Sequence, residues 1–166
     1  MMKRVIAWLA VLAALLALVA CGGETPAEEP QTVYTFTKGS TKIAVGADTA
    51  PILTSLGKEL KYYESPSCYF SGMDKIYTYA GFEIHTYPDP NGNGDRVNRI
   101  ILLDDTVQTE EGIYIGSSQA SVLAAYGEAT EKKADSWDYR CKDMYMRFFF
   151  ENGVVKEIQY LHLQAL

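Results

Sequence analysis

An internal repeat is the feature that most limits what this chain can fold into. The segment TKIAVGADTAPILTSLGKEL at 41–60 aligns without a gap on EGIYIGSSQASVLAAYGEAT at 111–130. Apolar residues and glycines fall at matching positions, namely Ile43 with Ile113, Val45 with Ile115, Gly46 with Gly116, Ile52 with Val122, Leu53 with Leu123 and Gly57 with Gly127. Self-similarity at a fixed offset indicates one structural unit that occurs twice.

Each copy predicts a short strand, a glycine turn and then a helix. Asp48 and Ser118 stand where N-cap side chains are favoured, and Gly57 and Gly127 stand where a helix ends on a residue with positive φ. The apolar residues of each helix form one narrow stripe, in which we expect Leu53 and Leu123 to be buried. Helices this short need a sheet to lie on.

Three strands are predicted after each helix. They span 76–80, 82–87 and 97–104 in the first copy, and 137–140, 144–150 and 154–163 in the second. Asn152-Gly153 is a strong signal for a type I′ hairpin between the last two. The predicted fold class is α+β, with two helix-plus-antiparallel-meander repeats at about 33–105 and 106–166. We expect one continuous antiparallel sheet with both helices on one face.

The segment DPNGNGDR at 89–96 begins like a calcium-binding loop. It occupies the hairpin position that Asn152-Gly153 occupies in the second copy. Its twelfth position is Ile100, in a predicted strand, where such a loop requires a bidentate Glu. We therefore predict a polar turn, no metal site and no cofactor, with adventitious calcium as the alternative.

The repeated motif carries a resemblance to a known fold family. It reads Gly-x-[Asp/Ser]-x-Ala-x-[Ile/Val]-Leu-x-x-[Leu/Tyr]-Gly and is followed by a meander. This resembles the tandem-repeat fold of β-lactamase-inhibitor proteins, and the same helix signature is seen in BamE-type outer-membrane assembly lipoproteins. The motif is a packing motif, so the resemblance implies a fold and no activity. The inhibitors use a different disulfide pattern, so their contacts are not transferred to residues here.

The N-terminus has the pattern of an export signal. Lys3 and Arg4 precede an apolar run at 5–18. Leu18-Val19-Ala20-Cys21 resembles the lipobox of bacterial lipoproteins, which implies cleavage before Cys21 and attachment of fatty acyl chains such as palmitate there. The chain also resembles surface lipoproteins of Gram-positive, gut-type bacteria. An ordinary signal peptide with a chance cysteine is the alternative.

This pattern predicts the organisation and location of the chain. Residues 1–20 are the signal peptide, 21–32 a flexible tether without large apolar side chains to pack, and 33–166 a single domain. The expected location is the extracytoplasmic face of the cell membrane, with the membrane contacted through the lipid anchor. Cys68 and Cys141 then lie in an oxidising compartment. They either form a disulfide or remain two free thiols, and the sequence favours neither alternative.

Charge and motifs exclude several functions. Of the 15 basic residues, removal of Lys3 and Arg4 leaves 13 against 21 acidic ones, a net charge of −8. An acidic chain of this kind does not seek phosphate backbones, so we expect no nucleic-acid partner. His85 and His162 fall within predicted strands, and adjacent Asp104 and Asp105 would point to opposite faces of a strand. We predict no catalytic residues.

One face of the sheet is the candidate binding surface. If Met144, Met146, Phe148 and Phe150 face the helices, alternate residues face away from them. The predicted binding residues are His85, Tyr87, Arg99, Ile101, Leu103, Tyr145, Arg147 and Phe149. Aromatic and Arg side chains of this kind anchor protein interfaces. The alternative has equal weight: this face is covered by the hairpin 34–45, by the segment 58–74 or by a second molecule.

The sequence thus predicts a surface-anchored, non-catalytic lipoprotein that binds a protein or another envelope ligand through its sheet face. Two alternatives remain at this point. One is an assembly or scaffold lipoprotein of the envelope. The other is an enzyme whose site is not visible in the sequence.

Overall fold

A computed structural model describes residues 33–163 of the chain. The predicted signal peptide, the predicted lipid-attachment residue Cys21 and the predicted tether lie outside these residues. Within residues 33–163, no helix is both long and apolar enough to cross a membrane.

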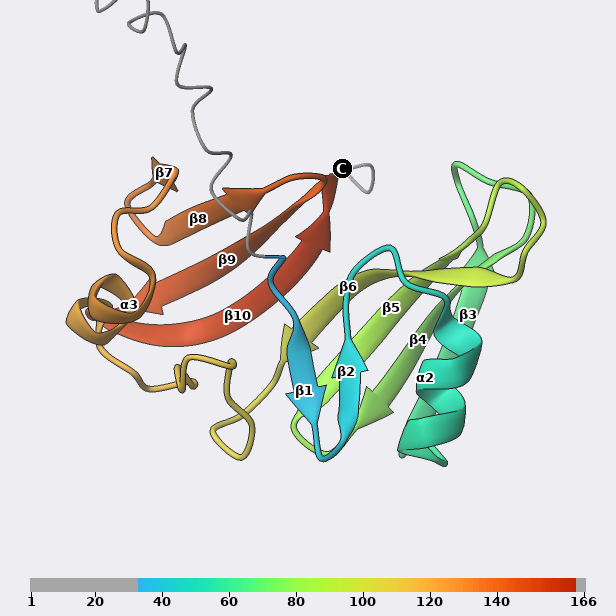
Figure 1. Cartoon of the computed structure of the whole chain (residues 1–166), viewed down its shortest axis with the longest axis horizontal. Coiled ribbons are helices and arrows are strands. Elements are labelled where there is room, and N and C mark those ends of the chain that lie inside the picture. The colour runs from blue at the N-terminus through green and yellow to red at the C-terminus, as the bar shows by residue number, and fades with distance from the viewer. Residues whose placement is uncertain (1–32, 164–166) are drawn as a thin grey trace, which may run out of the picture. The chain divides into compact units, whose positions relative to one another are not determined.

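The protein is α+β, with two helices and a large antiparallel sheet (Figure 1). The helices are α2 (Thr49–Leu56) and α3 (Gln119–Tyr126). The sheet has eight strands in the order β3-β4-β5-β6-β10-β9-β8-β7. Their bounds are β3 Lys61–Pro66, β4 Met73–Tyr79, β5 Phe82–Pro88, β6 Asp95–Leu102, β7 Glu131–Lys132, β8 Ser136–Cys141, β9 Met144–Glu151 and β10 Val154–His162. A separate hairpin joins β1 (Phe36–Lys38) to β2 (Thr41–Ile43).

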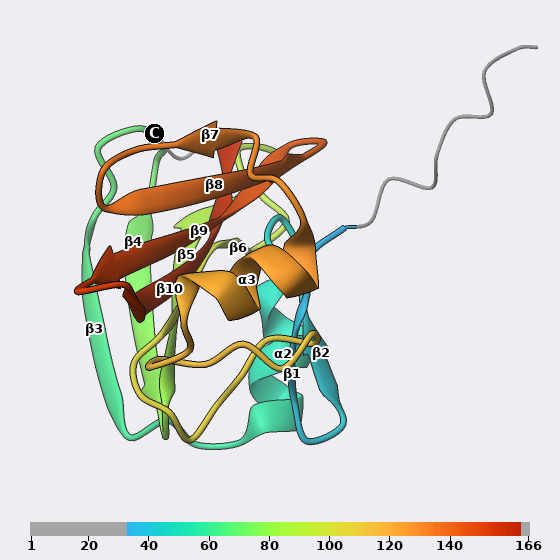
Figure 2. The ribbon, with the colours of Figure 1, turned by 90° about the vertical axis from the view of Figure 1, so that its left-hand side faces the viewer.

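The sheet is strongly twisted. In Figure 2, strands β8, β9 and β10 run across the direction of β3 to β6, although all of them belong to one hydrogen-bonded ladder. The central contact is β6 with β10, in which Ile100 lies opposite Tyr160 and Leu102 opposite Ile158. Twist of one hand accumulates across neighbouring strands, so the two ends of the sheet point in different directions.

The helix caps were predicted correctly. The Asp48 carboxylate accepts from the N–H of Ala50 at 3.0 Å, and the Ser118 hydroxyl accepts from the N–H of Ser121 at 3.1 Å. Gly57 and Gly127 have φ of 76° and 71°, and the N–H of each donates to the carbonyl of the leucine four residues before it. Residues other than glycine rarely adopt this φ, which explains the glycine at both sites.

The predicted apolar stripe packs on the core, but Leu53 and Leu123 are not its most buried residues. Ile52 and Val122 are 7% and 0% exposed, whereas Leu53 is half-buried and Leu123 is 37% exposed. Each step along a helix turns the side chain by about 100°. Because Thr49 and Ile52 together define the buried side of α2, the next residue points toward its edge.

One cluster of buried side chains forms the core. It gathers Ile52 and Val122 from the helices, Phe36 and Ile43 from the β1–β2 hairpin, and alternate residues of the sheet, namely Tyr79, Phe82, Ile84, Val97, Ile100, Leu102, Tyr139, Met144, Met146, Phe148, Phe150, Val155, Ile158 and Tyr160. We call the side of the sheet that carries these residues the core face. The four side chains of β9 that were expected to face the helices all lie there.

Two local expectations were also wrong. Residues 111–115 form turns and irregular chain instead of a strand, and Asp104 and Asp105 lie in a turn after β6. The segment 58–74 supplies the edge strand β3 and the turn that follows it, and its Phe70 packs against Tyr87. In that turn the N–H of Ser67 donates to the carbonyl of Gly72.

Two connections behave as their sequences predicted. Residues 89–94 join β5 to β6, and the Asp89 carboxylate accepts from the N–H of Asn91 at 2.9 Å and from Arg96. Asn152 and Gly153, between β9 and β10, both have positive φ, as a type I′ turn requires.

Candidate functional site

The side of the sheet opposite the core face carries two rows of cross-strand neighbours, and we call this side the open face. Strand register places the first row in the order Tyr63, Ile76, His85, Arg99, Leu161, Tyr145 and Arg140. The second row runs Lys61, Thr78, Glu83, Ile101, Gln159, Arg147, Asp138 and Glu131. Directly opposite side chains on one face of a sheet are close enough to interact.

Most of the predicted binding residues are brought together in these rows. His85, Arg99 and Tyr145 belong to the first row, and Ile101 and Arg147 to the second. Phe149 follows Arg147 on the same side of β9, opposite Ser136.

The other two predicted residues lie apart from the rows. Tyr87 is near the end of β5 and packs against Phe70, with ring centroids 5.4 Å apart. Leu103 follows the last residue of β6, and its side chain is 45% exposed.

The sequence analysis missed two acidic members of the open face, Glu83 and Asp138. Asp138 stands between Trp137 and Tyr139, and Glu83 follows Phe82, so alternation along each strand would have placed both carboxylates on the face opposite these aromatic rings. What the sequence did not supply was the partner, because Asp138 meets Arg147 only through the register of β8 with β9.

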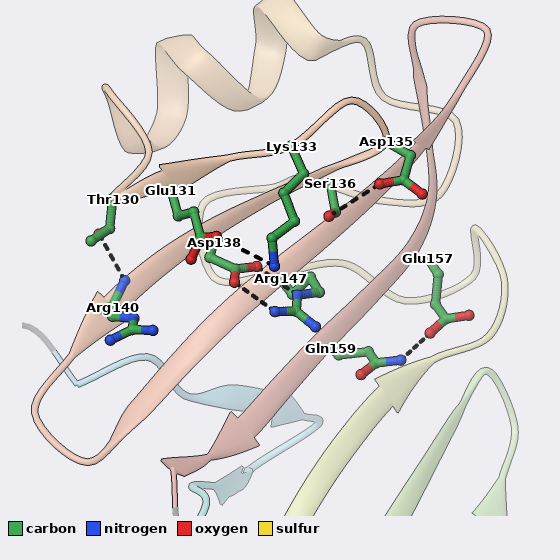
Figure 3. A network of polar contacts seen from close by, with 10 residues as sticks. All are labelled: Thr130, Glu131, Lys133, Asp135, Ser136, Asp138, Arg140, Arg147, Glu157 and Gln159. Atoms are coloured by element: carbon green, nitrogen blue, oxygen red, sulfur yellow. Dashed lines mark hydrogen bonds and ion pairs between the residues drawn. The ribbon is translucent and has the colours of Figure 1, made fainter. Parts of the chain in front are cut away.

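On β8 and β9, the polar side chains of the open face bind one another (Figure 3). Arg147 donates from Nε and Nη2 to the two carboxylate oxygens of Asp138, both at 2.6 Å. Its guanidinium also lies 5.0 Å from the ring centroid of Tyr145 and 5.7 Å from that of Phe149. Donation to Asp138 raises the pKa of Arg147, and Asp138 and Tyr145 are only 3% and 2% exposed.

Further polar contacts surround this pair in Figure 3. Gln159 donates to Glu157, Lys133 lies 3.4 Å from Glu131, and Ser136 donates to Asp135. The two ion pairs of this half of the open face, Arg147 with Asp138 and Lys133 with Glu131, therefore have both members within the same half.

Arg99, on the central strand β6, is in a different situation. It is partly buried between His85 on β5 and Leu161 on β10. Among residues 33–163 its guanidinium has no ion-pair partner and no side-chain hydrogen bond. The nearest carboxylate along its neighbouring strand is Glu83, which accepts from the hydroxyl of Thr78 at 2.9 Å and lies 3.2 Å from His85.

Burial lowers the pKa of His85, and the positive charge of Arg99 lowers it further, against an opposing effect of Glu83. The imidazole is therefore neutral at pH 7. Arg99 thus lies opposite a neutral ring, with the Glu83 carboxylate two residues along β5 and no ion-pair partner among residues 33–163.

Two buried polar atoms on the same face lack a hydrogen-bond partner within the described part of the chain. They are the hydroxyl of Tyr145 and Oδ1 of Asp74. An unpaired buried polar group destabilises a fold, which makes it available to a water molecule or to a ligand. The open face is thus closed over β8 and β9, and more accessible toward β3, where Tyr63 is 61% exposed.

Apart from the open face, a hollow lies at one end of the sheet, between β10 and the connection at 89–94. It has a volume of about 360 Å³ and is lined by His162, Tyr87, Asp143, Arg96 and Asp89, among others. Arg96 neutralises Asp89 with an Nη2 contact of 2.9 Å. Within residues 33–163, no group of three or more His, Cys, Asp and Glu side chains is arranged to hold a metal ion.

The two cysteines of the domain are free thiols in this structure. Cys68 is exposed in the turn after β3, and Cys141 is half-buried at the end of β8.

Comparison with known proteins gives no relative from which a site could be transferred. No protein-family model matches the chain, no curated protein matches it, and no solved structure matches it.

Proposed function

We propose that this chain is a non-catalytic lipoprotein, held at the extracytoplasmic face of the membrane through Cys21, that binds a protein partner through the open face of its sheet. The observation that carries this proposal is Arg99, a partly buried guanidinium on a central strand without a counter-charge among the described residues. A charge in such a place is costly unless a carboxylate neutralises it. The proposal assigns that carboxylate to the partner.

The surroundings of Arg99 suit a protein carboxylate. The guanidinium fork binds both oxygens of an Asp or Glu side chain at once. Ile101 and Leu161 add apolar surface next to it, and His85 presents a neutral ring. Arg side chains surrounded by apolar contacts are common energetic centres of protein interfaces.

The proposal includes the two-repeat architecture. Equivalent contacts occur in both halves, since the N–H of Gly46 donates to the carbonyl of Val97 and that of Gly116 to the carbonyl of Val155, both at 2.7 Å. The hydroxyl of Tyr79 donates to Gly57, and that of Tyr139 to Gly127, at 3.2 and 3.1 Å. Residues from both helices belong to the same core cluster, which supports their placement on one face of the sheet. The other face is then left for a partner.

A photo-activatable amino acid at Gln159, in the full-length chain on cells, tests the binding proposal. We expect one dominant cross-linked species, which is lost when Arg99→Glu is added because two carboxylates then repel each other. The matched control carries the same amino acid at Ala124, an exposed position on α3. Capture of the same species at Ala124, or capture that is insensitive to Arg99→Glu, would contradict the proposal.

The anchor is tested separately. Cys21→Ser removes the atom to which acyl chains would be attached, so the variant should leave the detergent phase on partitioning. Cys68→Ser is the control and should partition like the wild type.

A further inference from the structure

The edge strand β3 is the longest exposed edge of the sheet and carries two exposed tyrosines. It spans six residues, Lys61 to Pro66, and no strand within residues 33–163 pairs with its outer side. Tyr62 and Tyr63 are 46% and 61% exposed. The opposite edge strand, β7, has only two residues. An exposed strand edge is a template for pairing with another strand.

The direction of the backbone groups of β3 follows from its hydrogen bonds. The N–H of Ser67 donates to the carbonyl of Gly72, which marks a hydrogen-bonded pair at the end of the β3–β4 ladder. Hydrogen-bonded and non-hydrogen-bonded pairs alternate in an antiparallel ladder. The backbone groups of Ser65, Tyr63 and Lys61 therefore point toward β4.

The β4–β5 hairpin independently gives the same direction for the backbone groups of β3. Only Ala80 and Gly81 separate β4 from β5, and Tyr79 lies opposite Phe82. A two-residue turn closes on a hydrogen-bonded pair, so the backbone groups of Tyr79 point to β5 and those of Thr78 point to β3. Thr78 is the registered partner of Lys61, in agreement with the assignment above.

Tyr62 and Glu64 consequently present their N–H and C=O groups outward. Pro66 has no N–H, so it ends this outward row on one side. On the other side the N–H of Leu60 is already used, because it donates to Thr78 at 2.8 Å. Only a three-residue window centred on Tyr63 can pair.

We infer that this window pairs with the same window of a second copy of the chain, in antiparallel orientation about a two-fold axis at Tyr63. In this register Tyr62 of each copy lies opposite Glu64 of the other, so all four outward N–H and all four outward C=O groups of the two windows face one another. Lys61 lies opposite Ser65, and the two Tyr63 side chains meet on the open face. The pairing is closed, because each copy uses its single long edge.

The side chains favour this register. The hydroxyl of Tyr62 already donates to the carboxylate of Glu64 within one chain, and across the two-fold axis the same two groups face each other again. The two Tyr63 rings form a cross-strand aromatic pair. The contact is small, so it belongs to the weak class of interfaces. This inference does not depend on the proposed partner of Arg99.

Cysteine cross-linking in the full-length chain tests the inference, in a Cys68→Ser, Cys141→Ser background. The two copies of residue 63 would form a non-hydrogen-bonded pair with Cα atoms about 4.5 Å apart, within the range of a disulfide. Tyr63→Cys should therefore give a disulfide-linked dimer in membranes under a mild oxidant.

Lys61→Cys and Ser65→Cys are the matched controls. Each is displaced from its own copy by four residues, about 13 Å along the strand, so neither should cross-link alone. A mixture of the two should cross-link, because residue 61 faces residue 65. This pattern is specific to the proposed register.

Glu64→Pro provides a second variant that spares the fold. It removes an outward N–H and leaves the ladder with β4 intact, so the Tyr63→Cys dimer should disappear while the far-ultraviolet circular dichroism stays unchanged. Failure of Tyr63→Cys to cross-link, persistence of its dimer with Glu64→Pro, or efficient cross-linking of Lys61→Cys alone would each overturn the inference.

Discussion

The two halves of the sheet are alike on the core face and different on the open face. On the core face, both halves use the same glycine contacts, the same helix caps and the same tyrosine hydrogen bond to the glycine after the helix. On the open face, Arg147 is bound to Asp138 and closed in by aromatic rings, whereas Arg99 has no such partner among residues 33–163. The shared features therefore serve the fold, and the differing features are the basis of the proposed binding site.

The largest expected effect separates the two arginines. Arg147→Met leaves the nearly buried Asp138 carboxylate without its counter-charge, which should cost about 3–5 kcal/mol of unfolding free energy. Arg99→Met removes a charge without a counter-charge, so it should lower stability by no more than about 0.5 kcal/mol and can raise it. Urea denaturation midpoints measure both.

A double variant provides the control for this comparison. Arg147→Met combined with Asp138→Leu should recover most of the lost stability, because no buried charge is then left alone. Equal losses for Arg147→Met and Arg99→Met would remove the distinction between the two halves of the open face.

The second prediction compares buried and exposed positions on the helices. Ile52→Ala should cost about 2–5 kcal/mol, because the side chain is buried in the core cluster. Leu123→Ala should cost no more than about 1 kcal/mol, because its side chain is 37% exposed. Guanidinium denaturation of the two variants decides the matter, and a larger loss for Leu123→Ala would reverse the assignment of the buried side.

The third prediction tests whether the halves are equivalent where they look alike. Gly57→Ala and Gly127→Ala each place a Cβ on a residue with φ above 70°, which should cost about 1 kcal/mol. Neither position has an atom within 4 Å of the added Cβ, so the cost is conformational in both. Thermal unfolding should show shifts of similar size, and a clear inequality would indicate that the two helix ends are not equivalent.

The smallest effect concerns pH. The pKa of His85 is lowered in the folded protein by burial, so the folded state binds a proton less readily than the unfolded state. The stabilisation from the neutral imidazole is present above the unfolded pKa of about 6.5 and is lost as pH falls through the folded value. His85→Gln should flatten the stability profile below pH 6.5, and an imidazole NMR titration reports the folded pKa directly. A folded pKa above 6.5 would contradict the assignment.

Patterns along the chain were sufficient to predict helices, caps and turns, but not to predict which side chains meet across neighbouring strands. Asp48, Gly57, Asn152 and Gly153 act within a few residues of themselves, so caps and turns were predicted correctly. The side of the sheet on which Arg99 lies also followed, from alternation along β6. The Arg147–Asp138 pair could not be predicted, since it depends on the register of two strands.

The segment 58–74 shows the same limit. Coverage of the sheet face by this segment was left as an alternative, because a sequence does not distinguish a loop from an edge strand that pairs on one side only. Leu53 and Leu123 were assigned to the core because hydrophobicity alone does not fix the rotation of a two-turn helix.

The β1–β2 hairpin has a mechanical consequence if the chain hangs from an anchor at Cys21. Tension would reach the domain first at β1, which is paired with β2 by only three residue pairs. Phe36 joins this hairpin to the core through Phe82, at 4.9 Å between ring centroids, and Thr35 and Thr37 bind Glu110 at 2.8 and 3.0 Å. Under load, we expect the hairpin to detach before the ladder of the large sheet is sheared. Detachment of the hairpin would lengthen the connection between the anchor and the domain, while the large sheet that carries Arg99 stays folded.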